Sequence, residues 1–475
     1  MSTLPPTQES ARFPQLDDSQ YGDIQGVILH DYNLPQVRHY IFTIEHPEHA
    51  RHLLGNLASA DTMPLRITTG NDWGEDKRKD YALNVGLTYV GLQALHLPIE
   101  ALESFAAAKA FVAGAVERAA LIGDTGDSAP EHWKGQFAAA GAHVLFSLYT
   151  GDGDRNKRSQ ELRTLCEANG FTFLQQEDGA DLHDPRQSRT HLPGKLIHFG
   201  YQDGISQPDI DGAPPPTFQT GKCNGKSVTV PPGAFLLGYP SQWTQFRYPV
   251  PRPPQLGRNG SFVAFRMMEQ DVHAFEEHLQ KTAQTSGLSV EKIAAKICGR
   301  WRDGRPLALS PDGKTSVNRE DINAFDYRDD KNGLACPFGS HIRRTNPRGD
   351  RVAAEDGDKH PLIRRSMPYG PWYDGNDPKG TKIERGLLGL FICVNLEDQF
   401  EFLVSKWMNA GGFRRGLPSG TMDPLVSYTA GGKTFEVPAA NEIYQLAGFS
   451  QFIKTRGTMY CFLPSITALR YIGEL

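Results

Sequence analysis

Apolar and polar positions along the chain follow two periodicities, which together predict a mixture of strands and helices. At 142–149 the apolar residues Val144, Phe146 and Leu148 alternate with polar or smaller ones, which indicates a half-buried strand. At 269–284 apolar residues recur at helical spacing, which indicates an amphipathic helix. The same patterns predict further strands at 23–30, 39–44, 171–176, 233–239, 261–267, 386–396 and 459–463. Further helices are expected at 46–59, 99–121, 158–168, 289–298 (with Ser289 as N-cap) and 398–408.

The order of these elements is similar in the two halves of the chain. Each half offers strands and helices in the order that a split β-α-β unit requires, which is an antiparallel sheet with helices on one face. We therefore expect an α+β fold built by internal duplication. The segment 203–232 is rich in Gly, Pro, Asp and Thr, and we expect it to be the crossover between the halves. The stretch 301–378 has little periodicity, and a loop of that length inside a domain is usually functional or disordered.

Length and composition are typical of a globular enzyme with two or three domains. The chain has 475 residues, of which 39% are hydrophobic. Its net charge of −5 is spread without long runs of one sign, so no nucleic-acid or membrane-surface footprint is expected. No apolar window is long enough for a membrane span, and no secretory signal begins the sequence, so we expect a cytoplasmic protein. The six cysteines are far apart, and the absence of Cys-x-x-Cys excludes zinc-ribbon spacing and covalent c-type haem attachment.

One candidate for chemistry is a carboxylate between two glycines. Gly200 and Gly204 bracket Asp203, and glycine permits backbone conformations and close approaches that other residues forbid. Such a loop can lie against a ligand and direct a single acid at it. Asp-Gly is also a common turn dipeptide, so this loop taken alone is most simply a turn.

A second candidate is a histidine with arginines nearby in the sequence. His341 lies in the run Cys-Pro-Phe-Gly-Ser-His-Ile-Arg-Arg-Thr-Asn-Pro-Arg at 336–348, and an arginine pair follows at 364–365. The cations could bind phosphate or another polyanion, or the histidine could bind a metal centre whose organic part the arginines hold. Together with Asp203 these residues fit haem. Haem iron needs an axial nitrogen, its propionates need cationic or backbone donors, and peroxide cleavage needs an acid and a cation on the other side.

The sequence resembles the dye-decolorizing peroxidases, and the resemblance covers most of the chain. Three motifs carry it: Gly-x-x-Asp-Gly at 200–204, continuing as Ile-Ser-Gln-Pro; the histidine segment at 341–348; and Ile-Arg-Arg-Ser-Met-Pro-Tyr-Gly at 363–370. Flanking stretches also match, at 23–27, 83–89, 385–388, 399–402 and 462–466. The length is that of the longer members of the family.

The resemblance implies two ferredoxin-like domains, with antiparallel sheets and helices on the outer faces. We expect an N-terminal extension at 1–20, a first domain at 21–215 that ends in the Gly-x-x-Asp-Gly loop, and a second domain at 216–475. The second domain is expected to hold most of one haem b per chain.

The family's functional residues can be carried over by position. The resemblance implies that His341 is the proximal iron ligand and that Asp203 and Arg364 are the distal catalytic pair. It also implies contacts with the haem. Arg343 and Arg348 are expected at the propionates, Ile205 and Ser206 at the haem edge, and Leu388 in the distal wall. The acid that hydrogen-bonds His341 is expected to be Glu397, with Asp398 as the second choice.

The implied activity is a haem peroxidase that uses hydrogen peroxide to oxidise dyes, phenols or similar donors in one-electron steps, via a ferryl intermediate. Asp203 would accept and return the peroxide proton while Arg364 stabilises the developing charge. Because an unshifted aspartate titrates near about 4, we expect an acidic optimum. Trp372, Tyr373 and Trp407 are candidates for passing electrons from bulky donors at the surface.

Two positions depart from the family pattern. Ser366 stands where some short bacterial members carry Asn, and Gly389 stands where a bulkier residue is expected. Access to the distal pocket is therefore expected to differ.

Two rival functions remain open at this point. One is a haem-binding or haem-handling protein whose peroxidase activity is incidental, and the other is a non-haem enzyme that binds phosphorylated ligands through the arginine loop. The expected partners are hydrogen peroxide and small-molecule reducing substrates, with no nucleic acid and no membrane. A homo-oligomer is compatible with the sequence.

Overall fold

The structure is a computed structural model in which a defined set of residues is described. These residues are 15–59, 63–73, 80–182, 195–214, 222–223, 226–227, 229–243, 246–350, 359–377, 383–410, 413, 422–427 and 434–475. No helix in this part of the chain is both long enough and apolar enough to cross a membrane.

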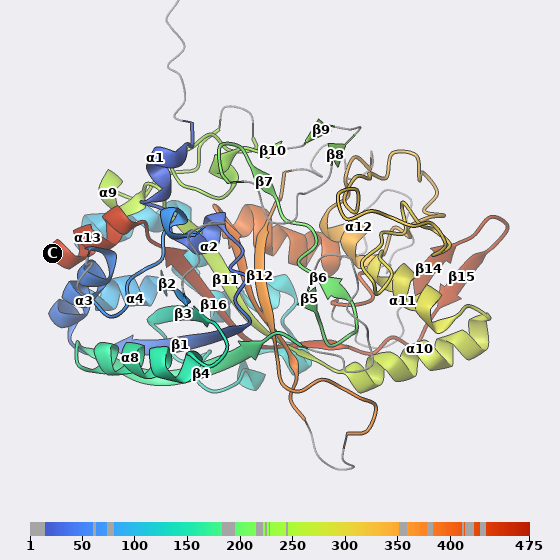
Figure 1. Cartoon of the computed structure of the whole chain (residues 1–475), viewed down its shortest axis with the longest axis horizontal. Helices are drawn as coiled ribbons and strands as arrows, with labels where there is room; N and C mark the ends of the chain where they lie inside the picture. The colour runs from blue at the N-terminus through green and yellow to red at the C-terminus, as the bar shows by residue number, and fades with distance from the viewer. Residues whose placement is uncertain are drawn as a thin grey trace, which may run out of the picture.

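An eight-stranded antiparallel sheet forms the centre of the molecule (Figure 1). The strands follow one another across the sheet in the order β12-β13-β11-β16-β2-β3-β1-β4. Their bounds are β1 (Gln36–Ile44), β2 (Tyr81–Leu87), β3 (Val144–Thr150), β4 (Phe171–Ala180), β11 (Ser261–Gln270), β12 (Ile363–Tyr369), β13 (Gly386–Cys393) and β16 (Ile453–Leu463).

The sheet order confirms the predicted α+β fold and its duplication. Within each half the four long strands stand in the order second, third, first, fourth, and every pairing is antiparallel. That is the arrangement of a split β-α-β unit. The halves join between β16 and β2 through a single residue pair, Phe462 and Leu87. The predicted domain boundary at 215 stays a prediction.

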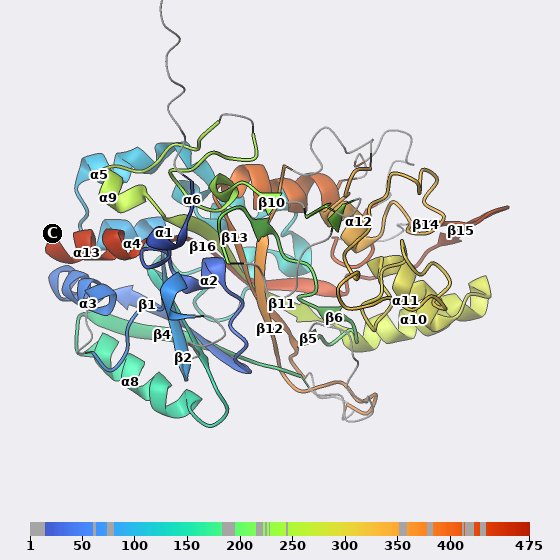
Figure 2. The same cartoon turned by 45° about the horizontal axis from the view of Figure 1, so that its top comes forward.

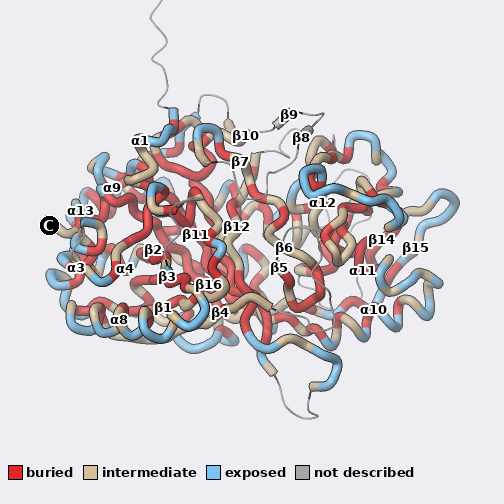
Figure 3. The backbone as a smooth tube through the Cα atoms, in the orientation of Figure 1, coloured by how far each residue is buried: buried red, intermediate tan, exposed pale blue. Residues whose placement is uncertain are grey.

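The sheet curls until its inner faces pack against each other. His39 on β1 and Phe265 on β11 belong to strands of different halves, yet their ring centroids are 4.5 Å apart. The two end strands also meet, since a Cβ placed on Gly179 of β4 would lie 3.1 Å from the Cβ of Met367 on β12. On the same inward side of β12, Arg365 donates from Nε to the carbonyl of Val27, 3.0 Å away. The buried backbone in the middle of Figure 3 corresponds to this shared core.

The longer helices form where caps and apolar spacing direct them. They are α3 (Pro47–Ser59), α8 (Arg155–Glu167), α10 (Val272–Ser286), α11 (Val290–Cys298) and α13 (Ile466–Glu474). Ser289 caps α11 by accepting from the Lys292 N–H, as predicted. α8 covers the outer face of the first half, where Arg38 on β1 donates to Ser159 at 2.6 Å. Figure 2 shows α13 beside α3 at one end of the molecule and α10 with α11 at the other.

Several predicted elements are wrong. The helix expected at 99–121 is a series of short turns, because Gly114 takes a φ of +80° that interrupts a right-handed helix. The strands expected at 23–30 and 233–239 are largely a helical turn and a 3₁₀ turn. The expected helix at 398–408 exists, but with π-type hydrogen bonding. The segments concerned are α2 (Gly26–Leu29), α5 (Ile99–Glu103), η2 (Ser104–Ala107), α6 (Lys109–Ala113), α7 (Ala115–Arg118), η3 (Ala120–Ile122), η6 (Pro232–Ala234), η7 (Leu396–Glu401) and η8 (Leu403–Met408).

Shorter elements complete the described chain. The helical turns are α1 (Asp18–Tyr21), η1 (Gly70–Asp72), α4 (Tyr89–Ala94), η4 (Gly126–Ser128), η5 (Pro130–His132), α9 (Pro254–Gly257) and α12 (His341–Thr345). The two-stranded ladders are β5 (Lys195–Leu196) with β6 (Gln202–Asp203), β7 (Asp209–Ile210) with β10 (Thr229–Val230), β8 (Lys222–Cys223) with β9 (Lys226–Ser227), and β14 (Phe435–Pro438) with β15 (Ile443–Leu446).

Candidate functional site

Asp203 and Arg364 form an ion pair on the outer face of β12. Arg364 Nη1 lies 2.9 Å from Asp203 Oδ1, and Arg364 Nη2 donates to the Ser206 carbonyl oxygen at 3.3 Å. The other carboxylate oxygen of Asp203 is 3.4 Å from the hydroxyl of Ser366. The structure thus brings together two predicted catalytic residues that are 161 positions apart.

The short β5–β6 hairpin holds Asp203 in place. The strands pair Lys195 with Asp203, and Gly200 and Gly204 adopt the positive φ values that its turns require, +83° and +76°. At the turn, buried His198 bonds through Nε2 to the Tyr369 carbonyl at 2.8 Å, and burial lowers its pKa to about 4. The hairpin is therefore attached to β12 near both ends of that strand.

The environment of Asp203 keeps its carboxyl group ionised. Burial alone would raise the pKa of Asp203, but the Arg364 guanidinium and the Gly204 backbone N–H outweigh that effect, so the pKa is lowered. The electrostatic interaction with His341 also lowers the pKa of Asp203, so His341 lies within electrostatic range of this pair. The side chain of Asp203 is 23% exposed, so its carboxylate is only partly shielded from solvent.

His341 begins α12 and is backed by a buried acid. Its Nδ1 lies 2.7 Å from Oδ2 of Asp423, whose side chain is fully buried. The second oxygen of Asp423 accepts from the Leu425 N–H at 2.9 Å. The predictions of Glu397 or Asp398 as partner of His341 are therefore wrong.

Both of those acids are engaged elsewhere. Glu397 accepts from the Ala110 N–H at 2.9 Å, and Asp398 accepts from the Tyr248 hydroxyl at 3.1 Å. No local motif points to Asp423, which lies 82 residues after the histidine.

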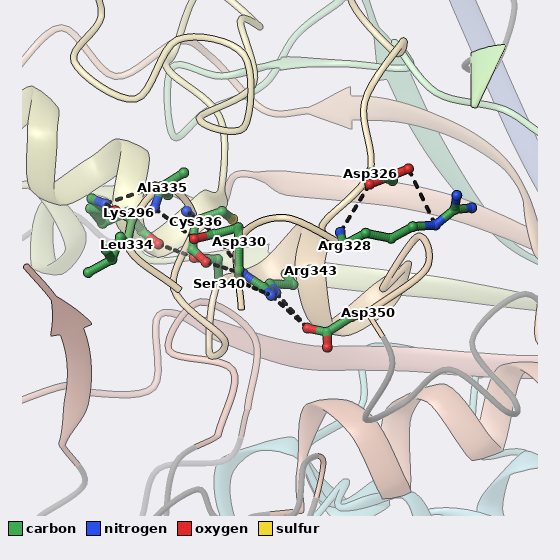
Figure 4. Close-up of polar contacts among 10 residues, drawn as sticks. All are labelled: Lys296, Asp326, Arg328, Asp330, Leu334, Ala335, Cys336, Ser340, Arg343 and Asp350. Atoms are coloured by element: carbon green, nitrogen blue, oxygen red, sulfur yellow. Dashed lines mark hydrogen bonds and ion pairs between the residues drawn. The ribbon is translucent and has the colours of Figure 1, made fainter. Parts of the chain in front are cut away.

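Arg343 supports the helix of His341 and is not available to a ligand. Its side chain is fully buried, and all five of its N–H groups donate to protein acceptors, on Asp330, Asp350 and the Cys336 carbonyl. Figure 4 shows its guanidinium pointing between Asp330 and Asp350. In the same view Lys296 donates to two carbonyls, those of Leu334 and Ala335, each at 2.8 Å. The predicted contact between Arg343 and a propionate is therefore wrong.

Arg344, the next residue, supports the proximal side from another direction. It is fully buried and donates to the carbonyl of Trp407 in the last turn of η8 and, at 2.6 Å, to the carbonyl of Ala410 just after that turn. The backbone N–H of Asp423 donates to Met408 in the same turn, at 3.1 Å. The π-helical segment therefore positions both the helix and the acid behind His341.

The structure keeps Arg348 beside the distal loop. Its guanidinium donates to the Ser206 hydroxyl at 2.9 Å and to the Asn323 carbonyl at 2.9 Å. Asn323, which the sequence did not suggest, is buried and also donates to the Ile205 carbonyl at 2.8 Å. Three of the predicted cofactor-binding residues, at 205, 206 and 348, thus lie together.

Leu388 does not line the distal wall. On β13 it stands opposite Met367, whereas Arg364 and Ser366 stand opposite Phe391 and Gly389. Since successive residues of a strand point to opposite faces, Leu388 faces the shared core and Phe391 shares the face of Arg364. The prediction was wrong by one position in register.

Cys298 links the two parts of the site electrostatically. Burial raises the pKa of the Cys298 thiol to about 12, and the charges of both Asp203 and Asp423 act in the same direction. Cys298 therefore lies within electrostatic range of the distal acid and of the acid behind His341. The arrangement therefore offers an imidazole and an acid–guanidinium pair within electrostatic range of each other.

Comparisons with known proteins place the chain among peroxidases. The chain is 30% identical to the multifunctional dye peroxidase DyP2 of Amycolatopsis sp., over 82% of this chain and 81% of the relative. It is 27% identical to dye-decolorizing peroxidase msp1 of Mycetinis scorodonius, over 99% of this chain and 90% of the relative. A solved dye-decolorizing peroxidase in complex with 2,6-dimethoxyphenol is 27% identical, with a TM-score of 0.76 over 95% of this chain and 99% of that one. No family model matches the sequence.

Proposed function

This chain belongs to the dye-decolorizing peroxidase family and is a haem peroxidase, and we propose that His341, Asp203 and Arg364 carry its chemistry. One observation above all supports the proposal. A histidine that is hydrogen-bonded to a buried acid lies within electrostatic range of an aspartate–arginine ion pair that is distant in sequence.

The donor set around His341 fits haem iron. An imidazole binds a metal through a nitrogen lone pair, and the hydrogen bond at the other nitrogen decides which tautomer is present. Here the Asp423 carboxylate accepts at Nδ1, so the proton is held there and Nε2 is left with its lone pair. Nε2 has no hydrogen-bond partner among the residues that the structure describes. We assign haem b, one per chain, because the sequence has no Cys-x-x-Cys-His motif for covalent attachment of haem.

The residues near the distal loop fit the polar edge of the cofactor. Arg348 and the Ser206 hydroxyl are 2.9 Å apart and can both donate to a propionate carboxylate. Ile205, which is 2% exposed and fixed through Asn323, supplies apolar contact at the same edge. Arg343 has no role in this assignment.

The distal residues supply the acid–base chemistry. When bound, haem provides an iron centre that accepts the electrons of two successive donor molecules after peroxide has oxidised it. Asp203 is ionised and accepts the first proton of hydrogen peroxide, then delivers it to the outer oxygen, which leaves as water. Arg364 stabilises the negative charge that develops on that oxygen as the O–O bond breaks. Phenols and dyes are the proposed donors, in line with the phenol bound by the solved relative.

The proposal can be tested with the haem-supplied protein and four variants. Asp203→Asn and Arg364→Leu are expected to slow the reaction with hydrogen peroxide by about 10²- to 10⁴-fold, followed by stopped-flow absorbance. His341→Ala is expected to abolish tight haem binding. The control is Asp178→Asn, because Asp178 forms a comparable ion pair with Arg38 on the first half, at 2.6 Å, away from the site.

The outcomes separate the leading proposal from its rival. Undiminished peroxide reaction in both distal variants would favour a haem-handling protein with incidental activity. Undiminished haem binding by His341→Ala would refute the ligand assignment. A cytoplasmic location and a homo-oligomer stay predictions from the sequence.

A further inference from the structure

The side-chain amide of Gln207 pairs with the backbone of Arg364 in the manner of a neighbouring strand. Gln207 Nε2 donates to the Arg364 carbonyl at 2.9 Å, and the Arg364 N–H donates to Gln207 Oε1 at 3.0 Å. β12 ends the order of strands in the sheet, so within the described part of the chain no strand is hydrogen-bonded to its outer side. The Gln207 side chain is 6% exposed and fills that position at one residue.

The same short loop also holds the side chain of Arg364. Asp203 receives Nη1 at 2.9 Å, and the Ser206 carbonyl receives Nη2 at 3.3 Å. Five consecutive residues, 203–207, therefore fix both the backbone and the guanidinium of the distal arginine. The separation of acid and arginine is then set by the loop and not by the flexible arginine side chain alone.

An equivalent contact exists in the first half of the duplicated fold. Gln25 Nε2 donates to the Val85 carbonyl at 2.8 Å, and the Val85 N–H donates to Gln25 Oε1 at 2.9 Å. Val85 lies on β2, which is the second long strand of the first half, and β12 is the second long strand of the second half. The sequences before the two glutamines also correspond, Tyr-Gly-Asp-Ile-Gln at 21–25 and Tyr-Gln-Asp-Gly-Ile-Ser-Gln at 201–207.

We call this pair of hydrogen bonds between a glutamine side chain and a strand backbone the amide clamp. The two copies differ in the residue that the amide clamp holds. In the first half, Asp23 accepts from the Thr467 N–H and from Asn259, both at 2.7 Å, and Val85 is a buried core residue. In the second half the corresponding aspartate is Asp203 and the clamped residue is Arg364, and these two side chains form the ion pair of the site. The amide clamp serves strand placement in one half and placement of the distal pair in the other.

We propose that Gln207 is a positioning residue of the peroxidase reaction, which fixes Arg364 relative to Asp203 by replacing the missing strand beside β12. The proposal rests on the function assigned to that pair. It also places the start of the second repeat at Tyr201, so that the Asp203 loop opens the second unit instead of closing the first.

The test compares Gln207→Leu with Gln25→Leu, which removes the corresponding two hydrogen bonds from the other copy and, in addition, the bond from Gln25 Nε2 to the Pro464 carbonyl. In the haem-free protein, hydrogen exchange of the Arg364 amide is expected to become at least about tenfold faster in Gln207→Leu, and that of the Val85 amide in Gln25→Leu. In the haem-supplied protein, the second-order rate constant for hydrogen peroxide is expected to fall about 10- to 100-fold in Gln207→Leu only, because small misplacements of reacting groups have effects of that size. Gln207→Glu, which can accept from the Arg364 N–H but cannot donate to its carbonyl, should fall between parent and Leu variant.

Two results would overturn the proposal. One is a peroxide rate constant in Gln207→Leu or Gln207→Glu within about twofold of the parent while the Arg364 amide is deprotected. The other is an equal loss of peroxide reactivity in Gln25→Leu, which would show a general structural effect. Failure of the underlying function is distinguishable, because Asp203→Asn and Arg364→Leu would then also react at the parent rate.

Discussion

Replacing Asp423 by asparagine should weaken haem binding without unfolding the chain. The carboxylate accepts from His341 Nδ1 at 2.7 Å through one oxygen and from the Leu425 N–H at 2.9 Å through the other. An asparagine oxygen can keep the bond to Leu425, but its NH₂ group then faces Nδ1 and favours the tautomer with the proton on Nε2. That tautomer has no lone pair for iron. Loss of such a partner typically lowers metal affinity about 10- to 100-fold, which corresponds to about 1.4–2.8 kcal/mol.

The measurement is a titration of haem into the haem-free variant, followed by visible absorbance, beside a denaturant unfolding curve of the haem-free chain. The free energy of unfolding is expected to fall by only about 1 kcal/mol, because one hydrogen bond is exchanged for a weaker one. Glu397→Gln and Asp398→Asn are the matched controls and should bind haem as the parent does. The reasoning fails if either control loses haem affinity while Asp423→Asn retains it.

Three other changes have expected outcomes. Because the pKa of Asp203 is lowered, its carboxylate stays charged as the pH falls to about 4. The rate constant for hydrogen peroxide in stopped-flow measurements should therefore stay constant down to that pH and decline below it. A decline of the rate constant near pH 6 would contradict this. The stability contributed by its ion pair is likewise present above the unfolded-state pKa and lost as the pH drops through the lower folded-state value. Arg343→Met should lower the free energy of unfolding of the haem-free chain by about 3–5 kcal/mol, since it removes the cation from buried Asp350 and half-buried Asp330. Arg348→Met should mainly weaken haem binding; the reverse ranking would restore Arg343 to the propionates. Gly389→Leu should destabilise the chain by about 1–3 kcal/mol in thermal unfolding, because its Cβ would lie 2.9 Å from the Phe391 ring. The same variant should slow the reaction with bulky hydroperoxides more than the reaction with hydrogen peroxide. Equal slowing of both reactions would argue against a role of this position in pocket access.

The parts of the site that local motifs specify could be predicted from the sequence. Asp203, Arg364 and His341 each lie in a short run whose residue types match the chemistry required. The structure brings Asp203 and Arg364 into contact as expected. Asp423 could not be predicted, because its only relation to His341 is a contact across 82 residues of chain.

Charge and register account for the other failures. Arg343 and Arg348 look alike in sequence, but burial commits every donor of the first to protein acceptors. Leu388 was misplaced because a shift of one residue moves a strand side chain to the opposite face. β12 itself was missed, since two arginines and a proline within seven residues do not read as a strand.

The alternation along β12 has a consequence for how this enzyme can change. Arg364 pairs with Asp203 on the outer face, while its neighbour Arg365 reaches back to the Val27 carbonyl and Met367 packs against Gly179 where the two end strands meet. One set of side chains therefore belongs to the proposed site and the other joins the two halves. A substitution on the outer face leaves the contacts between the halves in place, so the proposed site can be altered without separating them.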